Sequence, residues 1–327
     1  MKRIDKLSKL IATTLMLGGA ILLLTACGNA TAPASDDHAS GDNEQIRIGF
    51  AMPERDAWLT LKENAAVAHA EDLGVYLRVF DAQFDINQQI NHVQTFAAQG
   101  FDAIIINGLD PAFTETLIES ASGVPIIFVN RFPGDQYLEP GSAGFVGSDE
   151  TTVGPFQVEF LSQYFGDRTE PLDYVIFMGI LGHNSTLNRT NSFREAAIEA
   201  GFTMNNVFEQ SANFDRAIAM DLMQQFLGTG QNFDVVIANN DEMALGAIEA
   251  MRAVGITDIP VIGVDASPSG VQSIIDGDLN ASVFQNPVGQ GAGAVDKAIA
   301  AANGEVFPAV TWVPFELVTP DNVDNYR

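Results

Sequence analysis

The feature that most constrains the fold is an alternation of short apolar runs with longer amphipathic stretches, which starts at residue 46 and occurs twice. The short runs have the length of buried parallel strands, and the longer stretches have the apolar spacing of helices that cover a sheet. The first series predicts strands at 46–52, 75–81, 103–107 and 125–130, with helices at 58–73, 87–99 and 111–121. The second predicts strands at 174–178, 205–209, 235–238, 261–264 and 279–285, with helices at 186–200, 214–227, 242–254, 267–276 and 288–302. The predicted fold class is therefore α/β, with two doubly wound parallel sheets.

The first 26 residues have the three parts of a secretory signal. Four basic residues stand among the first nine, an uncharged run covers 10–24, and small residues precede Cys27. The apolar run is short for a membrane span. Leu24-Thr25-Ala26-Cys27 resembles the bacterial lipobox, and Cys27 is the only cysteine in the sequence. We expect cleavage before Cys27, lipidation of its thiol, and an extracytoplasmic protein anchored to a bacterial membrane, in the periplasm or on the outer face of the cell.

The mature chain is expected to begin with a flexible tether at 27–44, because this segment is small, polar and nearly free of large apolar residues. Without residues 1–26 the chain has 12 basic and 41 acidic residues, a net charge of −29. Such a charge repels nucleic acid and anionic headgroups, so we expect no nucleic-acid partner and membrane attachment through the lipid alone. Lipidation of Cys27 also leaves no thiol for a disulfide, a metal or a nucleophile.

Polar or aromatic residues follow nearly every predicted strand, at the sheet edge where doubly wound folds bind ligands. Carboxylates, amides and guanidinium groups offer paired donors and acceptors that suit vicinal hydroxyls, and aromatic rings offer flat faces for the C–H face of a sugar. The candidate ligand-binding residues are Asp56, Trp58, Asn107, Asn130, Arg131, His183, Arg189, Phe214, Asn240, Asp265 and Gln285.

Several motifs extend this interpretation to a family. They are Ile106-Asn107-Gly-Leu-Asp110-Pro111, Val124-Pro125-Ile-Ile-Phe-Val-Asn130-Arg131, Val146-Gly147-Ser148-Asp149, Phe214-Asp215-Arg216, Ala238-Asn239-Asn240-Asp241-Glu242-Met243-Ala244-Leu245-Gly246-Ala247 and Gly263-Val264-Asp265. With these motifs the chain from residue 46 to about 318 resembles the periplasmic sugar-binding proteins of ABC transporters, of the ribose and galactose/glucose type, which share their fold with LacI-type repressors.

The resemblance implies two lobes joined by a three-stranded hinge, with crossings near Ser148-Asp149, Gln285-Asn286 and Glu316. The first lobe would comprise 45–148 and 286–315, and the second 149–285 and 316–327. It also implies a monomer that closes on a monosaccharide and delivers it to a membrane permease, without a cofactor.

Each proposed ligand role has a structural alternative. Asp265 is either the principal hydroxyl acceptor or a helix N-cap, and the resemblance favours the ligand role. Asp241 is the expected cap of the helix at 242–254, which would leave Asn240 for the ligand. Trp58 and Phe214 either sandwich a sugar ring or belong to the core. Arg131 follows Asn130, where the ribose type commonly has Asp, so it lacks that adjacent charge partner.

The sequence also bears on nucleotide binding, metal binding and alternative functions. Gly289-Gln290-Gly291-Ala292-Gly293 has no phosphate-binding Lys nearby, so we attribute it to tight helix–sheet packing. The calcium loop of galactose binders is absent, so we expect no metal. The alternative function is a receptor for a sugar-like signal, an autoinducer or a ligand presented to a chemoreceptor. An intracellular regulator conflicts with the export signal, and a hydrolase lacks a poised pair of acids. Asp56, His183 and Arg189 favour galactose or glucose, whereas Phe214, Arg131 and Gln285 favour ribose.

Overall fold

The computed structural model describes residues 45–166 and 168–327. Within them the chain forms two six-stranded sheets flanked by helices, so the predicted fold class is confirmed. Both sheets are parallel except where β12 pairs antiparallel with β10. The signal, the lipidated Cys27 and the tether that the sequence predicts for residues 1–44 lie outside the described residues.

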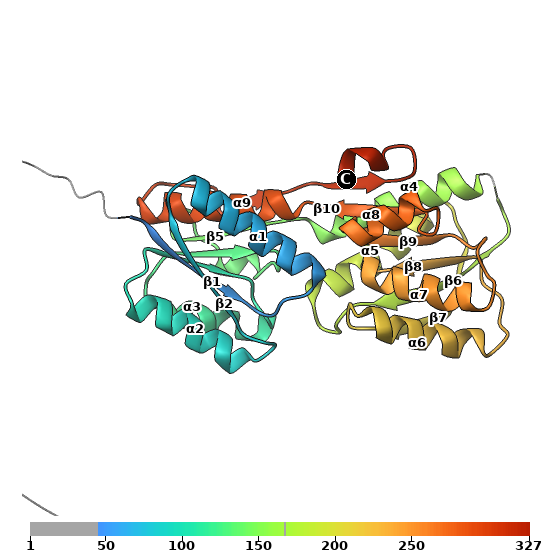
Figure 1. Ribbon diagram of the computed structural model, residues 1–327, viewed down its shortest axis with the longest axis horizontal. Coiled ribbons are helices and arrows are strands. Elements are labelled where there is room, and N and C mark those ends of the chain that lie inside the picture. Colours follow the sequence, from blue (N-terminus) through green and yellow to red (C-terminus); the bar gives the residue numbers. More distant parts are fainter. Residues whose placement is uncertain (1–44, 167) are drawn as a thin grey trace, which may run out of the picture. The chain divides into compact units, whose positions relative to one another are not determined.

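The first sheet has the strand order β11-β5-β4-β3-β1-β2. Its strands are β1 (Arg47–Met52), β2 (Tyr76–Asp81), β3 (Ala103–Ile106), β4 (Ile126–Val129), β5 (Ala143–Gly147) and β11 (Val310–Trp312). One face packs on α1 (Ala57–Asp72) and α9 (Pro287–Ala302), and the other on α2 (Ile86–Ala98) and α3 (Thr114–Ser120). We call this sheet with its four helices the first lobe (Figure 1).

The second sheet has the strand order β12-β10-β9-β8-β6-β7. Its strands are β6 (Leu172–Met178), β7 (Met204–Ser211), β8 (Val235–Ala238), β9 (Val261–Asp265), β10 (Ala281–Gln285) and β12 (Phe315–Val318). Helices α4 (Val153–Phe165) and α5 (Asn184–Glu199) cover one face, and α6 (Arg216–Leu227), α7 (Asp241–Ala253) and α8 (Pro268–Ile275) cover the other. Sheet and helices form the second lobe (Figure 1).

Three segments connect the two sheets. The chain leaves the first lobe after β5, returns after β10 through α9, and leaves again between β11 and β12. Short 3-10 helices lie at Pro111–Phe113, Asp135–Tyr137, Glu150–Thr152 and Val323–Tyr326. The sequence rhythm did not predict β5, α4, β11 or β12. The strand β5 contains two glycines, β11 has only three residues, and the charged Glu316 interrupts the apolar run of β12.

Successive side chains of β1 point alternately into the two cores on either face of the first sheet, as expected for a sheet covered by helices on both sides. Ile48, Phe50 and Met52 of β1 belong to the core under α1 and α9, whereas Ala51 packs under α2 and α3. Gly49 faces the second core, where a Cβ atom would lie 2.4 Å from the Phe96 ring. Among the helices of the described residues, none is both long and apolar enough to cross a membrane.

One glycine at the start of α9, Gly291, has a packing role that differs from the expected one. A Cβ atom on Gly291 would lie 2.5 Å from the Lys62 carbonyl oxygen and 2.9 Å from the Ala66 nitrogen, both in α1. The expectation of helix–sheet packing was therefore wrong at this position, because Gly291 allows close contact between two helices. It is confirmed at Gly293, where a Cβ atom would lie 3.2 Å from the Val146 side chain of β5.

Gly291→Ala should destabilise the protein by about 1–3 kcal/mol, since the added methyl group would push α9 away from α1. The better helix propensity of alanine, about 1 kcal/mol, offsets only part of that cost. Gly108→Ala is the matched control because a Cβ atom there meets nothing within 4 Å. Chemical denaturation of both variants measures the difference, and equal stabilities would contradict the packing argument.

Candidate functional site

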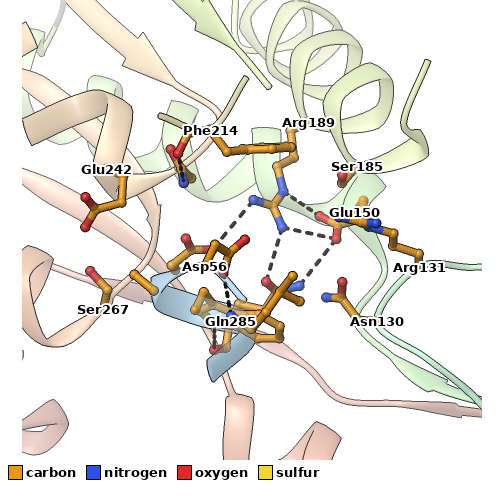
Figure 2. A pocket seen from close by; sticks show the side chains of 15 residues that line it. Asp56, Asn130, Arg131, Glu150, Ser185, Arg189, Phe214, Glu242, Ser267 and Gln285 are labelled. Atoms are coloured by element: carbon orange, nitrogen blue, oxygen red, sulfur yellow. Dashed lines mark hydrogen bonds and ion pairs between the residues drawn. The ribbon is translucent and has the colours of Figure 1, made fainter. Parts of the chain in front are cut away.

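The candidate site is a pocket where strand ends from both lobes meet (Figure 2). Nine of the eleven residues predicted from the sequence line it: Asp56, Trp58, Asn130, Arg131, Arg189, Phe214, Asn240, Asp265 and Gln285. Glu150, Ser185, Glu242 and Ser267 also line it and were not predicted. The rule that ligands bind at the carboxyl ends of parallel strands explains why residues from so many segments converge here.

Asp56 and Trp58 reach the pocket from the start of α1. Asp56 is the N-cap of this helix, and its Oδ1 accepts a hydrogen bond from the Leu59 nitrogen at 2.6 Å. The Trp58 indole is buried and donates through Nε1 to the Gln285 carbonyl oxygen at 3.0 Å. The tryptophan therefore links the two lobes directly, and its ring forms an apolar wall of the pocket.

Arg131 follows β4, and both terminal nitrogens of its guanidinium group have acceptors within the protein. Nη1 donates to the carbonyl oxygens of Gly108 and Leu109 at 3.1 and 3.3 Å, and Nη2 lies 3.4 Å from Glu54 Oε1. Burial lowers the pKa of Arg131 and raises that of Glu54, although the charge of each opposes the shift of the other. Glu54 therefore supplies the charge partner that Asn130 does not, and the sequence could not reveal it because the two residues are far apart in the chain.

Arg189 and Glu150 form a buried ion pair at the centre of the pocket (Figure 2). Arg189 Nε lies 2.6 Å from Glu150 Oε2, and Nη2 lies 3.1 Å from Oε1. Nη1 donates to the Asn239 carbonyl oxygen at 2.7 Å, and Nη2 to Gln285 Oε1 at 3.3 Å. The side chains are only 5% and 9% exposed. Glu150 follows the crossing predicted at Ser148-Asp149, and that position was the one sequence signal for its presence near the site.

The prediction that Asp241 caps α7 is wrong. Asn240 is the N-cap, with Oδ1 accepting from the Met243 nitrogen at 3.0 Å. Asp241 instead lies buried behind the pocket, where it accepts from the Ser267 nitrogen at 2.7 Å, Ser267 Oγ at 3.1 Å and Ser282 Oγ at 2.6 Å. Burial raises the pKa of Asp241 to about 7.

These contacts fix the turn that carries Asp265. Asp265 and Ala266 have φ angles of 114° and 45°, a strained conformation for residues other than glycine. The Ala266 nitrogen donates to Ser282 Oγ at 2.9 Å, and that hydroxyl donates to Asp241. Ser267 is the N-cap of α8, so the alternative role of Asp265 as a helix cap is excluded. Its carboxylate lies in the pocket, 3.7 Å from Arg189 Nη1.

Phe214 is the second aromatic residue of the pocket lining, and its backbone has a positive φ angle. It has a φ of 63°, directly after Asn213 with a φ of 56°. A Cβ atom on Gly179 would lie 2.0 Å from the Phe214 ring, so only glycine at that position leaves room for the aromatic side chain. The Phe214 carbonyl oxygen accepts from Asn240 Nδ2 at 3.4 Å, which connects the ring's segment to the next strand end.

The structure places Asn107 and His183 outside this pocket. Asn107 is fully buried; its Oδ1 accepts from the buried Lys62 ammonium, and its carbonyl oxygen accepts from Gln89 Nε2 at 2.8 Å. His183 lines a neighbouring pocket of about 240 Å³. Burial lowers the pKa of His183 to about 4, and the Arg131 charge acts in the same direction.

His183→Ala should therefore leave the Kd of the pocket nearly unchanged, because His183 contributes no atom to its lining. A neutral histidine also adds no pH dependence to binding between pH 5 and 8. Calorimetric titration of the ligand at both pH values measures each effect. A tenfold loss of affinity in the variant would place His183 in the site after all.

The pocket combines occupied donors with available acceptors. All the nitrogens of Arg131 and Arg189 that bear N–H groups have acceptors within the protein, except Arg131 Nε, for which the described residues provide no hydrogen bond. The described residues donate no hydrogen bond to the Asp265 carboxylate and only one to that of Asp56. They also contain no group of three metal-ligating side chains. The arrangement is suited to a ligand that donates hydrogen bonds and presents an apolar face.

Comparison with known proteins gives the family. Residues 48–305 match the periplasmic binding protein domain, so the chain belongs to that family, as predicted. A putative rhizopine-binding protein of Rhizobium meliloti is 35% identical over 83% of this chain and 89% of its own length. The ribose import binding protein RbsB of Bacillus subtilis is 30% identical, over 94% and 98% of the two chains.

A solved structure gives a similar result. The solute binding protein of an ABC transporter from Bacillus halodurans, with bound myo-inositol, is 37% identical to this chain. It superimposes with a TM-score of 0.79, over 88% of this chain and 99% of that one. These relatives are binding proteins.

Proposed function

We propose that this protein is the extracytoplasmic substrate-binding protein of an ABC importer for a polyhydroxylated ring compound, a monosaccharide or a cyclitol. The observation that carries the proposal is the pocket itself, whose lining combines carboxylate and amide side chains with two aromatic residues from opposite lobes, Trp58 and Phe214. Relatives whose names state rhizopine, ribose and myo-inositol as ligands support the same class of compound.

The proposed mode of binding follows from the chemistry of the wall. Hydroxyl groups of the ligand donate to Asp265 and Asp56, and Asn130 and Asn240 each supply an amide that can donate and accept. Arg189 is held in place by Glu150, and its N–H groups are taken up within the protein, so it is not available to bind an anion. This arrangement disfavours phosphates and sugar acids, because an anionic group would face carboxylates without an available guanidinium group.

Hinge closure is the proposed mechanism of capture. We take the lobes as 45–148 with 286–315, and 149–285 with 316–327. A ligand that contacts both Trp58 and Asp265 binds more tightly to the closed arrangement and so shifts the population toward it. The closed protein would then present a surface for a permease. Export through residues 1–26 and a lipid on Cys27 would hold the protein at the membrane from which uptake takes place.

Thermal shift with a panel of pentoses, hexoses and inositols tests the proposal, followed by calorimetry on each compound that stabilises the protein. A bound ligand at a hundred times its Kd stabilises a protein by about 2.7 kcal/mol, which is readily visible in such an assay. Glucose 6-phosphate and gluconate serve as anionic controls and should not bind. If the anions bind more tightly than every neutral polyol, the proposed function is wrong.

A further inference from the structure

Asp241 is a buried carboxylate that contacts the segment next to Asp265. It is the first residue of α7, is fully buried and does not line the pocket. Its Oδ2 accepts hydrogen bonds from the nitrogen and the hydroxyl group of Ser267, and its Oδ1 accepts one from the hydroxyl group of Ser282. Ser267 is the N-cap of α8 and Ser282 belongs to β10, so one side chain joins three elements.

Two hydrogen-bonded routes lead from Asp241 to the backbone that follows Asp265. The Ser267 nitrogen donates to Asp241 directly, at 2.7 Å. The Ala266 nitrogen donates at 2.9 Å to the Ser282 hydroxyl group, which in turn donates to Asp241 at 2.6 Å. Since Asp265 and Ala266 both have positive φ angles, this turn persists only because the surrounding structure holds it.

The surroundings of Asp241 leave space for its carboxylate at a cost in stability. A Cβ atom on Gly263 would lie 2.3 Å from Asp241 Oδ1, and one on Gly270 would lie 2.1 Å from Oδ2. The hydrogen-bond donors that the described residues offer to Asp241 are all uncharged. Burying a carboxylate without a cation destabilises a fold, and such local costs are typical of functional positions.

The charged groups around Asp241 are few. Burial raises the pKa of Asp241 to about 7; its three hydrogen bonds oppose the shift, and the charge of Glu242 on the same helix adds to it. Burial also raises the pKa of Asp265 on β9, where Arg189 from α5 opposes the shift and the charge of Asp241 adds to it. The elements α8 and β10 meet Asp241 with serine side chains.

We propose that Asp241 is a positioning residue for ligand binding: by accepting hydrogen bonds from Ser267 and Ser282, it holds the turn that places the Asp265 carboxylate in the pocket. The proposal rests on the proposed function and assigns part of the affinity to a residue outside the pocket. The ionised carboxylate accepts all three hydrogen bonds, whereas a proton on Oδ1 would leave the Ser282 hydroxyl group without its acceptor. Affinity for a neutral polyol should therefore decrease as the pH falls from 8 to 6.

Asp241→Asn tests this role, because it keeps the size of the side chain and removes one acceptor. The amide oxygen can still accept from Ser267, but the amide nitrogen cannot accept from Ser282. The probe is whichever of myo-inositol, D-ribose and D-galactose binds the wild type most tightly in calorimetry at pH 8. We expect the Kd of the variant to exceed that of the wild type about tenfold at pH 8, the effect of losing one hydrogen bond to a charged group. The two Kd values should be nearly equal at pH 6, where Asp241 of the wild type is mostly protonated.

Ser282→Ala breaks the indirect route and leaves the charge of Asp241 in place. It should also weaken binding of the probe at pH 8. In both variants, amide hydrogen exchange of Ala266, measured by NMR without ligand, should be faster than in the wild type. Asp321→Asn is the matched control, because it removes one carboxylate from an exposed position of the second lobe outside the pocket. It should change neither the Kd nor the exchange rate.

The possible failures are distinguishable. A wild-type Kd in Asp241→Asn at pH 8 overturns the inference and leaves the proposed function standing. An equal loss of affinity at pH 6 and pH 8 also overturns it, because the side chain would then act through packing alone. Unchanged exchange of the Ala266 amide in both variants would show that the turn does not depend on Asp241. If no probe binds the wild type, the proposed function fails together with the inference.

Discussion

Replacing Arg189 with methionine should destabilise the protein by about 3–5 kcal/mol, the usual cost of removing one partner of a buried ion pair. Glu150 would remain buried without its bidentate partner, and the Asn239 carbonyl oxygen would lose the donor that lies at 2.7 Å. Binding should be lost as well, because Arg189 holds Gln285 and faces Asp265 across the pocket. We expect no detectable polyol binding in a protein that still folds at low temperature.

A second variant separates the charge effect from the loss of packing. Arg189→Met combined with Glu150→Gln removes both members of the pair and leaves no uncompensated charge. It should regain part of the stability lost in the single variant, whereas ligand binding should stay absent. Urea denaturation gives the stabilities, and calorimetry gives the affinities.

The control for this series is an ion pair on the surface. Arg252 contacts Asp278, and the Arg252 side chain is 55% exposed. Arg252→Met should cost less than about 1 kcal/mol, as exposed pairs usually do. If Arg189→Met were as mild as Arg252→Met, the central pair would not have the structural role assigned to it.

The fold was predictable because parallel strands buried on both faces leave a strong pattern of short apolar runs. That pattern gave nine of the twelve strands found among the described residues, and the rule for strand ends gave nine residues of the pocket lining. The missing strands β5, β11 and β12 have little such pattern. Gly144 and Gly147 interrupt the first of them, β11 has only three residues, and the charged Glu316 interrupts the apolar run of β12.

The site residues that were wrongly predicted or missed have a common physical reason. Each of them depends on a contact between segments that are distant in the sequence. Sequence order suggested Asp241 as a helix cap, but two serines that follow later in the chain, Ser267 and Ser282, take up its carboxylate. Likewise, Glu150 and Glu54 became visible as arginine partners only in the structure. Residue type and strand position predict where a polar group lies, but not which residue forms its hydrogen bond or ion pair.

Asp265→Asn should weaken binding and at the same time stabilise the protein without ligand. Loss of a hydrogen bond to a charged group costs about 1.5–3 kcal/mol, or roughly a tenfold to hundredfold increase in Kd for a neutral polyol. Without ligand, however, Arg189 is already neutralised by Glu150, so Asp265 is a surplus buried charge. Asparagine is also among the residues that tolerate positive φ, so the turn at 114° is retained.

The sign of the stability effect follows from the raised pKa of Asp265. A carboxyl group whose pKa is higher in the folded than in the unfolded state binds more protons when folded, so its contribution to stability decreases as the pH rises above the unfolded value. The neutral asparagine does not ionise. The melting temperature of Asp265→Asn should therefore match that of the wild type near pH 4 and exceed it at pH 8. A difference of roughly 2–4 °C corresponds to about 1 kcal/mol in a protein of this size.

Calorimetry and thermal melts at pH 4, 6 and 8 measure both effects, with Asp321→Asn as the control for loss of one exposed charge. If Asp265 is present to bind the ligand, Asp265→Asn should lower the affinity and raise the melting temperature. An unpaired acceptor in the pocket then favours binding at a cost in stability. A variant that binds polyols normally would remove Asp265 from the site. A variant with a lower melting temperature at pH 8 would show instead that the carboxylate is a structural partner of Arg189, on which the empty protein depends.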